Sequence, residues 1–85
     1  MKNNPHPKIT FTDDEGWMLI ITLVRYSLGR QTYITNWCAN IVIRNWDALT
    51  DTQRDQIKRE ISEYKKSFGF STIDEPEWER ILNAK

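Results

Sequence analysis

Hydrophobic residues recur along the chain at intervals of three and four positions, which is the spacing of one face of an α-helix. Segments with this pattern lie at about 13–28, 36–46, 51–68 and 76–83. The pattern predicts an all-α fold, a compact bundle of about four helices that forms a single helical domain over 9–85. Residues 1–8 hold two prolines and no apolar periodicity, so we expect a mobile, flexible N-terminal arm there.

Polar residues and glycines mark the expected helix ends. Thr12 and Thr50 each begin a capping box, in which the threonine hydroxyl and the side chain three residues later bond free backbone amides. Thr35 is the expected cap of the second helix. Gly29 and Gly69 follow apolar series and suit the left-handed conformation that ends many helices.

The apolar faces predict which side chains form the core. The first helix has the widest face and is expected at the centre of the bundle; its members are Trp17, Leu19, Ile20, Ile21, Leu23, Val24 and Leu28. The second face comprises Ile34, Trp37, Cys38, Ile41, Val42 and Trp46. The third face comprises Ile57, Ile61, Tyr64 and Phe68. The fourth face comprises Trp78, Ile81 and Leu82. Trp37, Trp46 and Cys38 are therefore predicted core residues, and a partner-facing role is the less favoured alternative for the two tryptophans.

Composition supports a folded domain and limits the classes of partner. The chain is 39% hydrophobic with four tryptophans, enough to fold without a metal or a disulfide. Twelve basic and twelve acidic residues balance, which argues against a general polyanion binder and against an acidic DNA mimic. The beginning of the chain lacks the apolar run of a signal peptide, and 16–24 is too short to span a membrane. We expect an intracellular protein without membrane contact.

The side chains that catalysis requires are few. His6 is the single histidine and falls in the expected arm, and Cys38 has no neighbouring base in its series. These two residues are too few for a zinc site. Acidic clusters at 13–15 and 74–79 coincide with helix starts, where the helix dipole favours carboxylates. We expect no catalytic residue, no metal, no cofactor and no enzymatic activity.

A locally basic window is the best candidate for a binding site. Between Gly16 and Trp46 the chain has no acidic residue and no lysine, but it has three arginines. Two of them flank a turn with two tyrosines, and guanidinium and phenol groups are frequent anchors of interfaces. The predicted partner-binding residues are Arg25, Tyr26, Arg30, Gln31, Tyr33, Asn36 and Arg44. A purely structural role remains an equal alternative for Arg25 and Tyr26.

The middle half of the chain combines aromatic and charged residues at fixed spacing. The run Arg25-Tyr26-x-Leu28-Gly29-Arg30-x-Thr32-Tyr33-Ile34 follows Trp17 and precedes Asn45-Trp46 and Lys58-Arg59-Glu60-Ile61. In this combination the chain resembles a group of small bacteriophage and prophage proteins. The resemblance implies an accessory factor that binds and disables a host defence system, including CRISPR effectors. It carries over no site residue.

The leading hypothesis is a phage-type accessory protein that binds and inhibits a host defence protein or complex stoichiometrically in the bacterial cytoplasm. One alternative is a nucleic-acid or nucleotide binder that uses the basic aromatic turn at 25–33. A second is a structural or self-assembling phage component that exposes Trp46 or Trp78. A homodimer and a monomer both fit, because small helical domains often complete their cores by pairing.

Overall fold

The computed structural model describes residues 9–30 and 32–85, and this part of the chain is all-helical. Its elements are α1 (Asp13–Ser27), α2 (Thr32–Arg44), a short 3-10 helix η1 (Trp46–Ala48), α3 (Asp51–Phe68) and α4 (Glu75–Leu82). The predicted all-α class and the number of long helices are confirmed. The expected arm at 1–8 and the candidate residue Gln31 lie outside the described residues.

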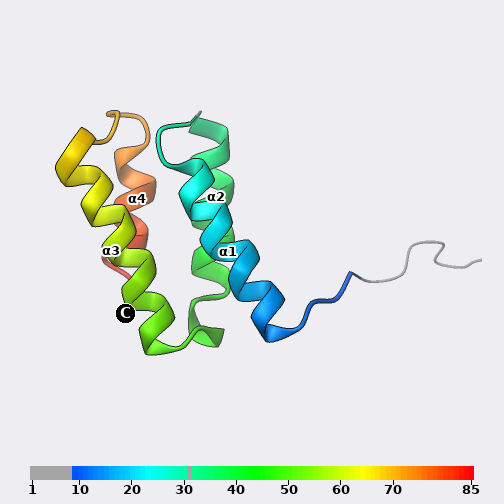
Figure 1. The fold of residues 1–85 in the computed structure, drawn as a ribbon. Helices are drawn as coiled ribbons and strands as arrows, with labels where there is room; N and C mark the ends of the chain where they lie inside the picture. Colours follow the sequence, from blue (N-terminus) through cyan, green and yellow to red (C-terminus); the bar gives the residue numbers. More distant parts are fainter. Residues whose placement is uncertain (1–8, 31) are drawn as a thin grey trace, which may run out of the picture.

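The four long helices form two antiparallel pairs that pack side by side (Figure 1). α1 and α3 run in one direction, and α2 and α4 run in the other. α2 packs against both α1 and α4, and α3 packs against the same two helices from the opposite side. Each helix therefore has two neighbours in the bundle and an outer surface that no other helix covers.

Local chemistry sets several helix ends as expected. The hydroxyl of Thr12 accepts a hydrogen bond from the amide of Glu15, whose carboxylate accepts from the amide of Thr12. Thr50 and Gln53 make the same reciprocal pair at the start of α3. Gly69, with φ 75°, follows the last residue of α3. These ends are confirmed because short-range hydrogen bonds and backbone freedom determine them.

The predicted limits of the second helix are wrong at both ends. α2 begins at Thr32, so Thr35 lies one turn inside the helix, where it is fully buried and caps nothing. The helix stops at Arg44, and Trp46 belongs to the 3-10 turn that leads to α3. Thr35 resembles a cap in sequence, but its small side chain fills space in the interior of the bundle.

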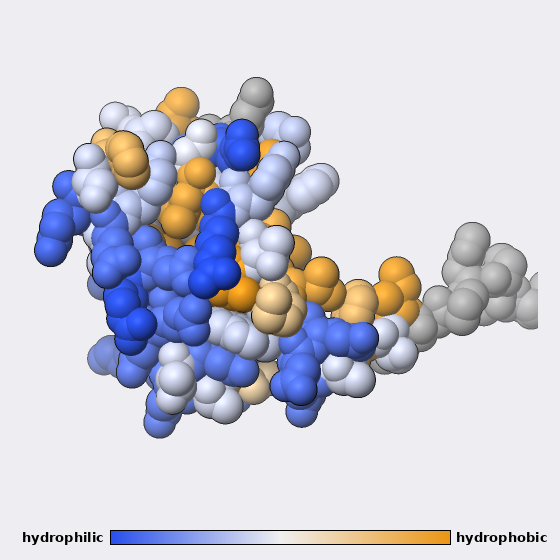
Figure 2. All heavy atoms as spheres, in the orientation of Figure 1, coloured by the Kyte–Doolittle hydropathy of each residue, from blue (hydrophilic) through white to orange (hydrophobic). Residues whose placement is uncertain are grey.

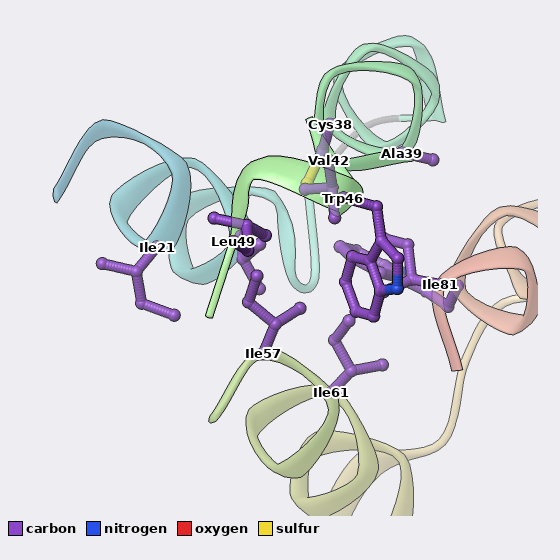
Figure 3. Close-up of a cluster of buried hydrophobic side chains, with 11 residues drawn as sticks. Ile21, Cys38, Ala39, Val42, Trp46, Leu49, Ile57, Ile61 and Ile81 are labelled. Atoms are coloured by element: carbon purple, nitrogen blue, oxygen red, sulfur yellow. The ribbon is translucent and has the colours of Figure 1, made fainter. Parts of the chain in front are cut away.

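The core contains buried side chains from all four long helices and from η1 (Figure 3). Its members are Ile21, Val24, Cys38, Ala39, Val42, Trp46, Leu49, Ile57, Ile61, Trp78 and Ile81. The predicted burial of Cys38, Trp46 and Trp78 is confirmed. Because Trp46 and Trp78 are buried, they offer no apolar surface for the self-assembly considered above.

Three residues predicted to be buried lie on the surface instead. Trp37 is 62% exposed, Leu19 is 49% exposed and Phe68 is 77% exposed. α1 is also an outer helix and not the centre of the bundle, since Met18 and Tyr26 on it are exposed as well. Each apolar face is wider than the contact with two neighbouring helices, so the residues at its margins remain in solvent.

Candidate binding surface on helix α2

The structure separates the predicted site residues into groups with different roles. Arg25 forms a bidentate pair with Glu60 of α3, with Nε–Oε1 and Nη2–Oε2 distances of 2.7 Å. The hydrogen bonds from Arg25 hold the pKa of Glu60 below its usual value, and the pKa of Arg25 is raised by the same contact. Arg25 therefore joins α1 to α3, which is the structural role that the sequence left as an alternative.

Tyr26 and Arg30 pair with each other at the turn between α1 and α2. The Arg30 guanidinium carbon lies 4.8 Å from the centre of the Tyr26 ring, a cation–π distance. Its Nε donates a hydrogen bond to the backbone oxygen of Tyr26, at 3.2 Å. Both side chains remain exposed, and Arg30 has no carboxylate partner within the described residues.

Asn36 belongs to a polar network that links α2 to α4. Its side-chain amide donates to Glu77, and its oxygen accepts from the amide of Asn40. Arg80 donates to Asn40 at 3.1 Å and to Glu77 at 2.7 Å. Burial raises the pKa of Glu77, but the hydrogen bonds from Arg80 and Asn36 outweigh it and lower the pKa. Asn36 is thus engaged within the fold.

The remaining predicted residues, Tyr33 and Arg44, lie on the outer face of α2 together with Trp37. Around a helix of 3.6 residues per turn, residue 37 points about 40° from residue 33, and residue 44 points about 20° from each of them. Tyr33 is 57% exposed, and its ring meets the ring of Trp37 edge to face with centroids 5.8 Å apart. The half-buried Ile41 continues the row toward Arg44. We call these four residues the α2 outer face.

Trp37 is a functional candidate that the sequence pattern assigned to the core in preference to a partner-facing role. Its position suits the apolar series of the second helix, which is why the core was the simpler interpretation. It also has the phase of Tyr33 and Arg44, which were both assigned to a binding surface. That shared phase is the signal that would have identified Trp37.

Charge and polarity around the α2 outer face resemble those of a protein interface. α2 contains no acidic residue, and Arg44 makes no ion pair within residues 9–30 and 32–85. Exposed Asn40 points only about 20° from Tyr33 around the helix, and its network with Asn36, Glu77 and Arg80 continues from the face toward α4. An aromatic and aliphatic centre with a hydrogen-bonded polar rim is the usual anatomy of such interfaces.

The described residues offer little for covalent or metal chemistry. Burial raises the pKa of the Cys38 thiol to about 11, so the thiol stays neutral and shielded. No group of three or more histidine, cysteine, aspartate or glutamate side chains in this part of the chain could hold a metal ion. None of the helices over the described ranges is long and apolar enough to cross a membrane. His6 lies outside the described residues.

The comparisons with known proteins find no relative of this chain. No family model, no curated protein and no solved structure matches this chain. The resemblance to small phage proteins therefore stays a prediction from the sequence, and the surface must be interpreted from its own chemistry.

Proposed function

We propose that this chain acts by stoichiometric binding of another protein through the α2 outer face. The observation that carries the proposal is the exposure of Trp37, paired with Tyr33, in a fold that buries Trp46 and Trp78. Burying a large apolar side chain stabilises a fold by roughly 1.5–3 kcal/mol. A tryptophan and a tyrosine that stay largely in water forgo much of this stabilisation. Tryptophan, tyrosine and arginine are also the residues that contribute most to binding energy at interfaces.

The positions of the arginines favour a protein over a nucleic acid as the partner. A backbone of phosphates calls for several free cations along one surface. Arg25 is neutralised by Glu60. Arg30 precedes α2 and Arg44 is the last residue of α2, which is about 18 Å long, so the two cations are far apart. The zero net charge of the chain supplies no wider positive field.

A finer proposal names the partner as a component of a bacterial defence system, including a CRISPR effector. It is supported by the resemblance of the segment around 25–34 to small phage proteins. In this proposal the chain is an inhibitor in the cytoplasm of the bacterial host, and its binding energy comes from the same Trp37 surface.

The test is affinity capture from bacterial lysate followed by calorimetry with the purified captured protein. We expect saturable binding at one copy per partner site for the wild-type chain and a loss of at least about tenfold in affinity for Trp37→Ala and Tyr33→Ala. Phe68→Ala is the matched control, because Phe68 is also an exposed aromatic residue but lies on α3. Equal affinity of Trp37→Ala and the wild type for every captured protein would overturn the proposal.

Two further measurements separate the alternatives. Tight, salt-sensitive binding of oligonucleotides that Trp37→Ala leaves unchanged would favour the nucleic-acid alternative. Phage plating on a strain with an active defence system tests the finer proposal, which requires protection by the wild-type chain and none by Trp37→Ala. Unchanged plating with retained protein binding would remove the defence role and leave the binding function.

A further inference from the structure

A pocket lies at the end of the bundle where α1 and α3 begin. In Figure 1 this is the lower end, where the connection from α2 to α3 lies between the first turns of these two helices. The pocket has a volume of about 340 Å³, within the roughly 300–1,000 Å³ of small-molecule sites. Its apolar wall comprises Trp17, Ile20, Ala48 and Leu49. The surface in this view is largely hydrophilic, and hydrophobic atoms reach it in only a few places, so an apolar pocket wall stands out from it (Figure 2).

Gly16 forms a bare stretch of the wall of this pocket. It lies within α1, where its amide donates a helical hydrogen bond to the oxygen of Thr12 at 2.8 Å. Glycine is the least favourable residue in a helix after proline, and Gly16 does not have the positive φ that accounts for Gly29 and Gly69. A Cβ atom on Gly16 would meet no heavy atom within 4 Å outside its own helical turn. Neither backbone conformation nor packing requires this glycine, and a reason that remains is the close approach of a bound group to the bare backbone.

Two side-chain amides, those of Asn45 and Gln53, supply hydrogen-bonding groups at the pocket. The Nδ2 of Asn45 donates to the oxygen of Ile41 at 2.8 Å, so its Oδ1 is an acceptor that has no partner within the described residues. The Oε1 of Gln53 accepts from the amide of Thr50 at 3.0 Å, so its Nε2 is a donor that has no partner there either. The backbone group that each amide faces fixes its orientation. The pocket therefore offers one acceptor and one donor beside its apolar wall.

Charge at the pocket favours a neutral ligand over an anion. Over the described residues, no lysine or arginine lines the pocket, and Asp13 is its one charged residue. The positive ends of the α1 and α3 dipoles point toward it, but Asp13, Asp14 and Asp51 in the first turns already interact favourably with them. An anionic ligand would lie beside Asp13 without a counter-ion, and such like-charge contacts weaken binding.

We propose that this pocket binds a small, neutral, planar molecule that carries a carboxamide. The ring lies on the backbone at Gly16, because a helical turn without a Cβ atom there presents a flat surface, and it contacts the apolar wall at Trp17. The carboxamide oxygen accepts from Nε2 of Gln53, and its N–H donates to Oδ1 of Asn45. Because the pocket is separate from the α2 outer face, this inference goes beyond the proposed function and does not depend on it.

Indole-3-carboxamide is the probe, and indole-3-carboxylate is its matched control. Titration of the isotope-labelled chain, followed by NMR, reports binding residue by residue. We expect saturable shifts of the backbone amide of Gly16, the indole N–H of Trp17 and the side-chain amides of Asn45 and Gln53, with a Kd on the order of 0.1–1 mM. The carboxylate lacks the donor and carries a negative charge, so it should bind at least about tenfold more weakly.

Gly16→Ala separates a binding role of this glycine from a structural one. The added Cβ atom has open space and raises helix propensity, so the urea midpoint should rise. The same Cβ atom occupies the position of the bound ring, so the Kd for indole-3-carboxamide should rise by at least about tenfold. Thr22→Ala is the matched control, because Thr22 is exposed on the same helix and does not line the pocket. It should also raise the midpoint but leave the Kd unchanged.

Four results would contradict the proposal. The first is the absence of saturable shifts up to about 5 mM probe, and the second is equal affinity for the carboxamide and the carboxylate. The third is an unchanged Kd in Gly16→Ala. The fourth is a lower urea midpoint in that variant, which would give Gly16 a structural role. None of these results bears on partner binding by Trp37, because that test uses a different surface and a different ligand.

Discussion

The hydroxyl oxygen of Tyr64 on α3 lies 2.6 Å from the point where a Cβ atom on Gly29 would stand. Gly29 has φ 79°, a conformation that glycine adopts at little cost. The turn between α1 and α2 is therefore held against α3 at a position where only glycine fits. This contact joins the candidate turn to the other helix pair, and it explains the glycine in two independent ways.

Gly29→Ala is expected to destabilise the domain by about 2–4 kcal/mol, the sum of a left-handed backbone penalty and overpacking against Tyr64. Gly69→Ala is the control, because Gly69 has φ 75° but open space around it, and it should lose only about 1–2 kcal/mol. Urea denaturation measures both. Adding Tyr64→Phe should recover part of the loss at Gly29 and none at Gly69. Equal losses at the two glycines would show that Tyr64 does not constrain the turn.

The Arg25–Glu60 pair should make the stability of the fold fall in acid. The hydrogen bonds from Arg25 lower the pKa of Glu60 in the folded protein. The contribution of the ionised carboxylate to the free energy of unfolding is therefore fully present above the usual pKa of 4.5 and is lost as the pH falls through the folded pKa. Glu60→Gln should therefore be less stable than the wild type near neutral pH, and the difference should vanish in acid. Urea midpoints measured across this range provide the test.

Glu63→Gln is the matched control for that experiment. Glu63 is exposed on the same helix and makes no ion pair within the described residues. Its replacement should leave the urea midpoint unchanged across the range. A constant difference between Glu60→Gln and the wild type at every pH would mean that the ion pair contributes nothing.

The tryptophans should divide sharply in their contribution to stability. Trp78 is only 2% exposed, and truncation to alanine should cost about 3–5 kcal/mol. Because a domain of this size is stabilised by only about 4–13 kcal/mol, that loss is a large part of the total, and Trp78→Phe serves as the milder test. Trp37→Ala should cost about 1 kcal/mol or less, chiefly the edge-to-face contact with Tyr33.

Fluorescence gives a second measure of the same difference. Trp37→Phe should remove the emission component at the longest wavelength and most of the quenching by acrylamide, since Trp37 is the most exposed indole over residues 9–30 and 32–85. If Trp37→Ala were as destabilising as Trp78→Phe, the indole would have to be buried and the α2 outer face would lose its anchor.

The buried thiol should make the fold sensitive to alkali. Burial raises the pKa of Cys38 from 9.0 to about 11. The contribution of the neutral thiol to the free energy of unfolding is therefore fully present below about pH 9 and is lost as the pH rises through about 11. Cys38→Ala should flatten this part of the stability profile. At about pH 8 the native thiol should react with a disulfide reagent only after urea unfolds the chain. Immediate reaction in the native protein would contradict the burial.

Features that depend on a few neighbouring residues were predictable from the sequence. Thr12 and Thr50 cap helices because each bonds an amide three residues away, and Gly69 ends a helix because its backbone tolerates a positive φ. Apolar spacing predicted the helices and placed Trp46 and Trp78 in the core. Such signals act over one or two turns, so no knowledge of the packing was needed.

Tertiary structure alone decided which margins of the apolar faces are covered. Trp37 falls in the apolar series of the second helix, but α1 and α4 pack against other sides of α2 and leave it in solvent. Arg25 pairs with a carboxylate 35 residues away, and Asn36 with one 41 residues away. Periodicity gives the direction of a side chain around its own helix. Whether a neighbouring helix lies in that direction depends on how the four helices pack, and that determines which residues are free to bind a partner.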